Sequence, residues 1–441
     1  MNDGMVARGL RQMRKLVGVR PGASRLPPRQ LQQLRQQLRE CAEGVGGEVS
    51  VRMRAARLGE TYLKLDADGR HDLLRLIALE FGPDPKTVDR AHAAYRAAVG
   101  TAAQWDAEAD LRAAMRSARL RILTQFNALP QGVKFLVDLR ADLLRFLDGD
   151  AELAALDREL ESRLTAWFDV GFLELSRVTW SSPAALLEKL IQYEAVHEIR
   201  SWTDLKNRLD SDRRCYAFFH PRMPMEPLIF VEVALTDRLA DSVQSLLDET
   251  APVFDAQRAD TAIFYSISNT QAGLRGVSFG NFLLKRVIDD LKHDFPRLRS
   301  FATLSPLPQL ASWVRLNPGL LAGTGVDLTA LQSGRWASDR TLVRRLRDPL
   351  MRLAARYLHE TRQGAASSGP LDPVARFHLG NGARIERINW LADTSPKGFK
   401  QSFGVMVNYL YNPDEIESNV EAFVSDGSIS ESASVRRLAR R

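Results

Sequence analysis

Two side chains in the second half of the chain could move a proton, Ser305 and His378. Ser305 ends the apolar run FATLS, and Pro306 and Pro308 fix the backbone just beyond it. His378 stands in ARFHLG (375–380), a strand-like run that the turn signal G-N-G closes. Imidazole is the side chain best suited to move a proton near neutral pH, so these residues are candidates for general acid–base chemistry. Alone, each pattern more often marks a structural residue, a serine that closes its own turn or a half-buried histidine.

A glycine-rich segment, QAGLRGVSFGNFLLKRV, follows the strand-like run TAIFYSIS (261–268). Gly273, Gly276 and Gly280 stand between that strand and an amphipathic helix, where small residues let backbone N–H groups approach a phosphate. No Gly-Lys-Ser/Thr follows, and the glycines lack the dinucleotide spacing, so the segment is neither a P-loop nor a Rossmann fingerprint. The structural alternative is a turn that holds no ligand.

Other catalytic signatures are missing from the sequence. No G-x-S-x-G elbow accompanies the serines, so a hydrolase lacks its signature. The histidines show no H-E-x-x-H or H-x-H spacing, and Cys41 and Cys215 are too few for a disulfide framework or a cysteine-rich zinc site. The sequence therefore predicts no metal site. Tyr411 stands in the alternating run GVMVNYLY, whose aromatic residues are more typical of a core than of a site.

The chain has two parts that differ in the pattern of their apolar residues. Before residue 168, apolar residues recur at helical spacing, as in the stripe that begins at Leu153 behind the candidate cap Asp150. Strand-like runs then alternate with helical stretches, and they cover residues 215–220, 228–235, 261–268, 299–305, 375–380 and 404–411. We predict an all-α helical bundle over 1–167, with about the first 25 residues disordered. A mixed α/β domain over 168–424 and a disordered polar tail over 425–441 would follow.

The net charge of +7 lies at the two ends of the chain. Residues 1–40 carry nine Lys/Arg and two Asp/Glu, and residues 431–441 carry four Arg and one Glu, which leaves −3 for residues 41–430. We therefore expect no nucleic-acid partner. No apolar stretch reaches the roughly 18–20 residues of a membrane span, and no secretory apolar core opens the chain. We expect no membrane partner and a location in the bacterial cytoplasm.

The segment RGVSFGNFLL resembles the pyrophosphate loop of the GCN5-related N-acetyltransferase fold, R-G-x-G-x-G-x-x-L-L. Arg275 and two glycines match, whereas Ser278 replaces a third glycine. The resemblance implies that backbone amides hold the pyrophosphate of coenzyme A. The residues implied to contact it are Gln271, Arg275, Gly276, Val277, Ser278, Phe279, Gly280 and Asn281. In that fold the fourth and fifth strands splay apart, which implies that Ser266 and Ser305 lie near the acyl end.

The chain resembles the malonyl-CoA decarboxylase family in the segments MPMEPLIFVEVALT, AIFYSISNTQAGLRGVSFGNFLLKRV, FATLSPLP and VARFHLGNGARIERINWLADTSPKGFKQSFGVMVNYLY. The resemblance implies the conversion of malonyl-CoA to acetyl-CoA and CO2 without a metal or organic cofactor. It implies a catalytic pair, Ser305 and His378, and further active-site positions at Ser266 and Tyr411. Some family members carry a Glu where this chain has Ser278, so any role of that carboxylate has no counterpart here.

Several points stay open on the sequence alone. An acyltransferase on the same fold would need a base near the fourth strand, yet TAIFYSISNTQ contains no acidic residue. A protein that binds nucleic acid or anionic membrane through its basic ends is a third interpretation. The family resemblance implies a homo-oligomer, a dimer or tetramer, built through the helical domain. Either Ser305 or His378 could deliver the proton, and Asn381 could fix the imidazole tautomer or simply form a turn.

Overall fold

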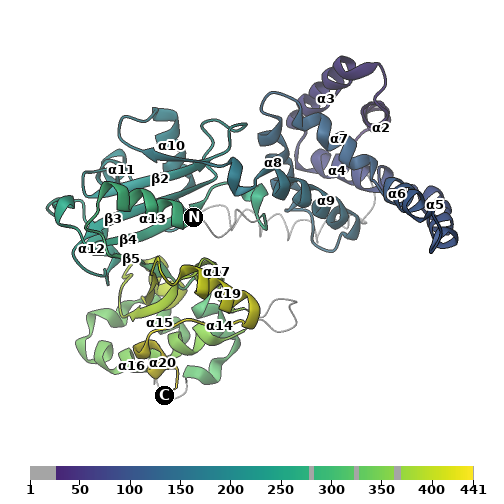
Figure 1. Cartoon of the computed structure of the whole chain (residues 1–441). Coiled ribbons are helices and arrows are strands. Elements are labelled where there is room, and N and C mark those ends of the chain that lie inside the picture. Colours follow the sequence, from purple (N-terminus) through teal and green to yellow (C-terminus); the bar gives the residue numbers. More distant parts are fainter. Residues whose placement is uncertain (1–25, 278–282, 322–326, 362–368, 441) are drawn as a thin grey trace. The chain divides into compact units, whose positions relative to one another are not determined.

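The computed structural model describes residues 26–277, 283–321, 327–361 and 369–440 (Figure 1). The chain divides into two compact units. Unit 1 comprises Met1–Trp167 and Gln271–Val277, and unit 2 comprises Phe168–Thr270 and Ser278–Arg441. The first 25 residues, expected to be disordered, lie outside the described part of the chain. None of the helices that the structure describes is long and apolar enough to span a membrane.

The described part of unit 1 is helical, as predicted. Its α-helices are α2 (Pro28–Glu43), α3 (Gly47–Lys64), α4 (Ala67–Glu80), α5 (Pro85–Ala98), α6 (Gln104–Ala114), α7 (Ala118–Asn127), α8 (Gly132–Leu143) and α9 (Ala151–Trp167). Helix α9 begins where Asp150 Oδ1 accepts the N–H of Leu153 at 3.0 Å, which confirms the predicted cap. The apolar stripe of α9, from Leu153 to Leu164, is fully buried.

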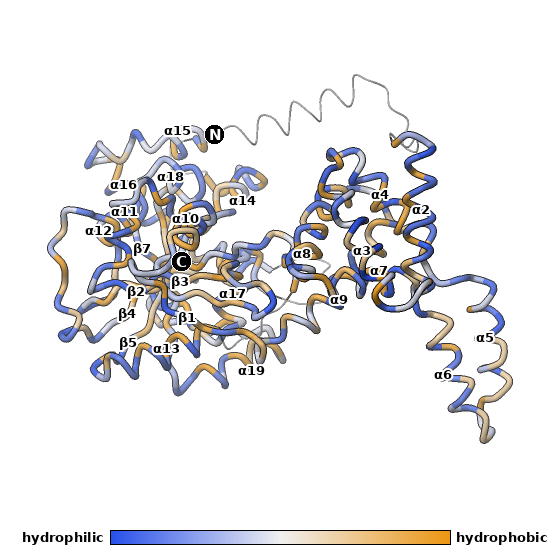
Figure 2. The backbone as a smooth tube through the Cα atoms, turned by 90° about the horizontal axis from the view of Figure 1, so that it is seen from above, coloured by the Kyte–Doolittle hydropathy of each residue, from blue (hydrophilic) through white to orange (hydrophobic). Residues whose placement is uncertain are grey.

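Helices α5 and α6 form a hairpin that extends away from the other helices of unit 1 (Figures 1 and 2). Neither helix has a buried residue. Trp105 is 72% exposed at the start of α6, and Val99 and Met115 are also exposed. The hairpin therefore carries several large apolar side chains that the described part of the chain leaves exposed.

Unit 2 is built on a mixed sheet, as predicted. Its strands are β1 (Glu174–Val178), β2 (Arg213–Phe219), β3 (Ile229–Thr236), β4 (Thr261–Asn269), β5 (Ser300–Thr303), β6 (Ser305–Pro306), β7 (Arg384–Asn389) and β8 (Met406–Tyr411). Their order is β1-β2-β3-β4-β5-β8-β6, and β7 also pairs with β8. Only β4 and β5 pair in parallel among the described strands.

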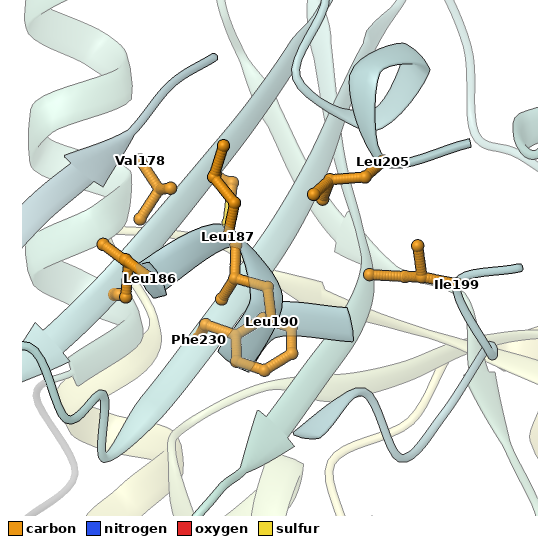
Figure 3. Packing of buried hydrophobic residues seen from close by; sticks show 9 residues of the cluster. Val178, Leu186, Leu187, Leu190, Ile199, Leu205 and Phe230 are labelled. Carbon is orange, nitrogen blue, oxygen red and sulfur yellow. The ribbon is translucent and has the colours of Figure 1, made fainter. Parts of the chain in front are cut away.

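Helices alternate with these strands along the chain. They are α10 (Ala184–Tyr193), α11 (Trp202–Arg208), α12 (Val243–Leu246), α13 (Leu283–Asp294), α14 (Leu310–Leu316), α15 (Leu328–Ser333), α16 (Arg340–His359), α17 (Pro373–Gly380), α18 (Pro396–Ser402), α19 (Ile416–Asp426) and α20 (Ala433–Ala439). Figure 3 shows how α10 and α11 are attached, with Leu187, Leu190 and Leu205 packed over Phe230 of β3. Each such buried side chain contributes about 1.5–3 kcal/mol, so the first three strands have a continuous core on this face.

The parallel pair β4–β5 opens partway along its length. The two strands pair from Thr261 to Phe264 on β4 and from Ser300 to Thr303 on β5. Beyond Phe264, β4 continues to Asn269 beside β3, while the chain after β5 turns to β8. The pairing of β4 with β5 thus ends at Phe264 and Thr303, as the splay that the acetyltransferase resemblance implies requires.

The expectation that 375–380 forms a strand is wrong. These residues lie in helix α17, which begins at Pro373 and ends at Gly380. Asp372 caps the helix, because its Oδ1 accepts the N–H groups of Val374 at 2.9 Å and Ala375 at 2.8 Å. Aspartate followed by proline is a strong helix-start signal, and it decides the structure of this short apolar run.

The expectation of a disordered tail over 425–441 is also wrong for the residues described, which extend to 440. Helix α20 lies in this tail, and the hydroxyl of Ser432 caps it by accepting the N–H of Val435 at 3.3 Å. Val435 is buried, and Glu431 forms a β-bridge with Ile385 of β7. Buried apolar surface and pairing with β7 therefore help to anchor a segment whose composition is polar.

Candidate active site

Ser305 is positioned by an interruption in the pairing of β8. β5 pairs with β8 up to Ala302, and β6 resumes the pairing at Ser305. Side chains fill the gap, because Tyr409 N–H donates to Thr303 Oγ1 at 3.1 Å and Asn408 Nδ2 donates to the Thr303 carbonyl at 2.6 Å. The Ser305 hydroxyl also donates to Thr303 Oγ1, at 2.8 Å. Thr303 therefore places both the strand and the serine.

His378 lies near the C-terminal end of α17, between two hydrogen-bonding side chains. Its Nε2 is 2.9 Å from Ser305 Oγ, and its Nδ1 is 2.8 Å from Tyr411 Oη. The Tyr409 ring stacks on the imidazole, with ring centroids 4.5 Å apart and planes 27° apart. His378 is 2% exposed and Tyr411 is 1% exposed. The imidazole is thus fixed on both nitrogens and on one ring face, in a site closed to bulk water.

Burial keeps this site uncharged. Removal from water disfavours the imidazolium and lowers the pKa of His378 to about 3. The same loss of hydration raises the pKa of Tyr411 well above its ordinary value. Both side chains are therefore neutral near pH 7. A neutral imidazole carries a single N–H, so it donates from one nitrogen and accepts at the other.

Tyr411, and not Asn381, is the partner of His378 Nδ1. Asn381 is the C-terminal cap of α17, and its Nδ2 donates to the Phe377 carbonyl at 2.7 Å. Of the two roles left open for Asn381, the structure supports the turn. The partner of Nδ1 therefore comes from a strand that follows the helix in the sequence, since Tyr411 ends β8.

Ser266 lies on β4 past its pairing with β5, and a carboxylate fixes its side chain. The Ser266 hydroxyl donates to Glu194, with both carboxylate oxygens 2.8 Å away. Glu194 also accepts from the hydroxyl of Ser268 at 3.0 Å, and from the backbone N–H groups of Val196 at 2.9 Å and His197 at 2.7 Å. A carboxylate with four donors is held firmly, so Ser266 keeps one orientation.

A buried ion cluster lies next to this part of the sheet. Glu232 pairs with Ser266 across β3 and β4, and it accepts from Arg208 at 3.1 Å. Arg208 also donates to Asp204 at 2.7 Å. Burial raises the pKa of Glu232 to about 8, although the Arg208 guanidinium opposes the shift. Removing one member would leave a buried polar or charged group without its partner, which is costly inside a protein.

The segment implied to contact coenzyme A is described only in part. Ser278, Phe279, Gly280 and Asn281 lie outside the described residues, whereas Gln271, Arg275, Gly276 and Val277 belong to unit 1. Arg140 of α8 holds this described part, because its Nη1 donates to the carbonyls of Gly273 at 2.9 Å and Arg275 at 2.7 Å. Arg140 is buried and pairs with Asp157 at 2.8 Å. The ion pair anchors the turn after β4.

Packing explains one of the glycines without any ligand. A Cβ on Gly273 would lie 1.8 Å from the backbone carbonyl oxygen of Val137 in α8. Gly276 has a positive φ of 88°, which favours glycine. These two glycines therefore serve the close approach of the turn to α8 and its backbone conformation. Their presence alone does not indicate phosphate binding.

Two residues of this region, Thr303 and Glu194, were not predicted from the sequence. Thr303 stands two positions before Ser305, and alternation along a strand places such residues on one face, so that signal was available. Glu194 reaches Ser266 across a separation of 72 residues, for which the sequence carries no local signal. The structure brings Ser305, His378 and Tyr411 together, and it joins Ser266 to Glu194.

Comparisons with known proteins agree on one family. Residues 81–168 match the family model of the malonyl-CoA decarboxylase N-terminal domain, and residues 171–441 match that of the C-terminal domain. The relative named "Malonyl-CoA decarboxylase, mitochondrial" from Anser anser anser is 39% identical over 425 residues, which cover 87% of this chain and 82% of the relative.

Two solved structures are similar over almost their whole length. That of malonyl-CoA decarboxylase from Rhodopseudomonas palustris is 41% identical with a TM-score of 0.86, and the match covers 92% of this chain and 99% of the other. That of malonyl-CoA decarboxylase from Cupriavidus metallidurans is 45% identical with a TM-score of 0.72, and the match covers 93% of this chain and all of the other.

The substitution Gly273→Ala tests the packing of the turn on α8. The added methyl group meets a backbone oxygen that cannot move alone, so we expect a loss of about 1–3 kcal/mol in the free energy of unfolding, measured with urea. Gly59→Ala in α3 is the control, since its Cβ meets nothing closer than 3.8 Å and alanine favours a helix. Equal stability of the two variants would contradict this role of Gly273.

The protonation of His378 gives a second test. Its pKa near 3 in the folded chain, against 6.5 as the ordinary value, means that only the unfolded chain takes up this proton between those values. The free energy of unfolding therefore contains the full contribution of the neutral His378 above pH 6.5. That contribution is lost as the pH falls toward 3. The 15N resonances of His378, assigned with His378→Asn, should stay those of a neutral ring from pH 8 to pH 5. A titration near pH 6.5 would contradict the buried, neutral state.

Proposed function

Because the chain belongs to the malonyl-CoA decarboxylase family, we propose that it converts malonyl-CoA to acetyl-CoA and CO2. Both the N-terminal and the C-terminal parts of the chain match models of this family. The observation that best supports the reaction is the 2.9 Å contact between Ser305 Oγ and His378 Nε2 in a buried, uncharged site. We assign the chemistry to this pair.

The proposed reaction needs donors and a dry site more than it needs a cofactor. Loss of CO2 from the malonyl thioester leaves an enolate, and the thioester carbonyl itself accepts the electron pair. Stabilising that oxygen therefore calls for preorganised hydrogen-bond donors. Excluding water favours the loss of charge from the carboxylate as CO2 departs. We propose that no metal ion or organic cofactor takes part.

Proton delivery is the step assigned to Ser305 and His378. One C–C bond breaks as CO2 leaves, and one C–H bond forms when the pair gives a proton to the enolate carbon. The pair recovers that proton from solvent, so each turnover takes up one proton. Because burial lowers the pKa of His378 to about 3, the donor at neutral pH is a neutral N–H or O–H and not an imidazolium. A neutral donor also forms no ion pair with the substrate carboxylate. Such an ion pair would stabilise the carboxylate and oppose its departure as CO2.

Other residues are proposed to bind the substrate. Tyr411 fixes His378 from the side opposite Ser305, and the 2.8 Å contact supports this assignment. Ser266 lies on the part of β4 that has left β5, where the resemblance puts the acyl end. The segment from Gln271 to Asn281 is proposed to hold coenzyme A through its backbone amides.

An amine acyltransferase on the same fold is the competing function. It would use a carboxylate near β4 as a base, and Glu194 is the carboxylate that contacts β4 through Ser266. Both oxygens of Glu194 already accept hydrogen bonds, from two hydroxyl groups and two backbone N–H groups. This arrangement favours a fixed structural carboxylate over a base that must take a proton from an amine.

We also propose that the chain forms a homo-oligomer, a dimer or tetramer, through its helical unit, and that it acts in the bacterial cytoplasm. The hairpin of α5 and α6, in which Trp105 is 72% exposed, supports a contact between two copies of the chain at this hairpin. Similar bacterial structures support the location. Sedimentation equilibrium of the purified chain checks the first proposal, and a monomer at micromolar concentration would contradict it.

Substitutions at the pair test the proposed function. Ser305→Ala and His378→Asn should each lower kcat for acetyl-CoA formation by about 10²- to 10⁴-fold, because each removes a group that takes part in proton transfer to the enolate carbon. Binding of coenzyme A should stay near that of the unmodified chain, since neither residue belongs to the proposed pyrophosphate segment. The assay contains malonyl-CoA and no metal, and its readouts are acetyl-CoA and CO2.

Two matched substitutions serve as controls. Ser333→Ala and His92→Asn change exposed residues of the same types and should keep full activity. Addition of amine acceptors should change neither the rate nor the product. The assignment fails if the unmodified chain forms no acetyl-CoA, or if both pair variants turn over at the unmodified rate.

A further inference from the structure

We propose that Thr303 is a positioning residue that sets the direction of the hydrogen bonds through Ser305 and His378, and so selects the imidazole tautomer. The four side chains form one buried line, Thr303, Ser305, His378 and Tyr411. Successive polar atoms are 2.8, 2.9 and 2.8 Å apart. None of the four side chains is more than 6% exposed.

The direction of this line starts at Thr303. Its Oγ1 accepts the backbone N–H of Tyr409 at 3.1 Å, which occupies one of its two acceptor sites and leaves the other for the Ser305 hydroxyl. The same oxygen accepts the Ser305 hydroxyl at 2.8 Å. The Ser305 proton therefore points away from the imidazole, and Ser305 Oγ presents a lone pair to His378 Nε2.

The donors on the imidazole follow from this arrangement. Nε2 must carry the proton, because it faces the lone pair of Ser305 across 2.9 Å. A neutral ring has only one N–H, so Nδ1 accepts, and Tyr411 O–H donates to it across 2.8 Å. The line runs from Tyr411 through His378 and Ser305 to Thr303. This is the reverse of a serine nucleophile, whose hydroxyl donates to the histidine.

The direction of the hydrogen bonds is inferred without the proposed function. Only its purpose, the protonation of the enolate, rests on that function. With Nε2 protonated, the pair is poised to give a proton and not to remove one from Ser305. A decarboxylase needs a proton donor for the enolate carbon, whereas a hydrolase or acyltransferase that uses Ser305 as a nucleophile needs a base. Thr303 thereby biases one Ser–His pair toward protonation.

The test replaces the hydroxyl of Thr303 while keeping its shape, in Thr303→Val. Without that acceptor, Nε2 is the nearest acceptor for the Ser305 proton, so we expect the 15N spectrum of labelled histidine to show His378 moving from the Nε2–H to the Nδ1–H tautomer. We expect kcat to fall about tenfold or more, as when a catalytic histidine is held in the wrong tautomer, while KM stays within about twofold. Thr303→Ser restores the hydroxyl and should restore both readouts.

The tautomer is read without substrate, so this test is independent of the proposed function. An Nε2–H ring in the unmodified chain that changes in Thr303→Val supports the inference even if malonyl-CoA is not turned over. An Nδ1–H ring in the unmodified chain overturns it, as does an unchanged tautomer in the variant. If Thr303→Val does not fold, Thr303→Ala removes the same acceptor with less bulk in the strand, and the same two outcomes decide.

Discussion

The hydrogen bond between Ser305 and His378 forms inside the protein, where a polar atom without a partner costs about 1–3 kcal/mol. Its 2.9 Å length therefore depends on everything that holds the two side chains. Asp372 starts the helix that carries His378, and the gap in the pairing of β8 brings Ser305 to face it. Burial then makes the imidazole neutral, and a neutral imidazole imposes an order of donors and acceptors on its neighbours.

These constraints suit a reaction that loses charge. The malonyl carboxylate leaves as neutral CO2, so a dry site with uncharged donors opposes it less than a site built from cations. The same dryness makes each hydroxyl and N–H a stronger partner for the oxygen of the enolate. Glu194 and Arg208 instead lie beside β4, where Glu194 accepts from Ser268 and Arg208 donates to Asp204 and Glu232. The proposed pair of Ser305 and His378 has no such charged partner among its hydrogen bonds.

The sequence predicted the architecture where a pattern is local. Helical stripes predicted the first unit. Strand-like apolar runs predicted the strands that carry Ser266 and Ser305, and alternation predicted the strand that carries Tyr411. The run around His378 was misassigned because the Asp-Pro start signal lies just outside it, and a short apolar run fits either a strand or a helix. The grouping of His378 with Tyr411 and of Glu194 with Ser266 could not be read from spacing, because tertiary folding alone joins residues so far apart.

A double-substitution cycle tests most directly whether Ser305 and His378 act as one unit. The quantity to measure is kcat/KM for malonyl-CoA in Ser305→Ala, His378→Asn and the double variant. If one hydrogen-bonded pair handles the proton, the second substitution has nothing left to remove, and the double variant should be within about threefold of the slower single variant. Losses that multiply, as for independent groups, would contradict the account.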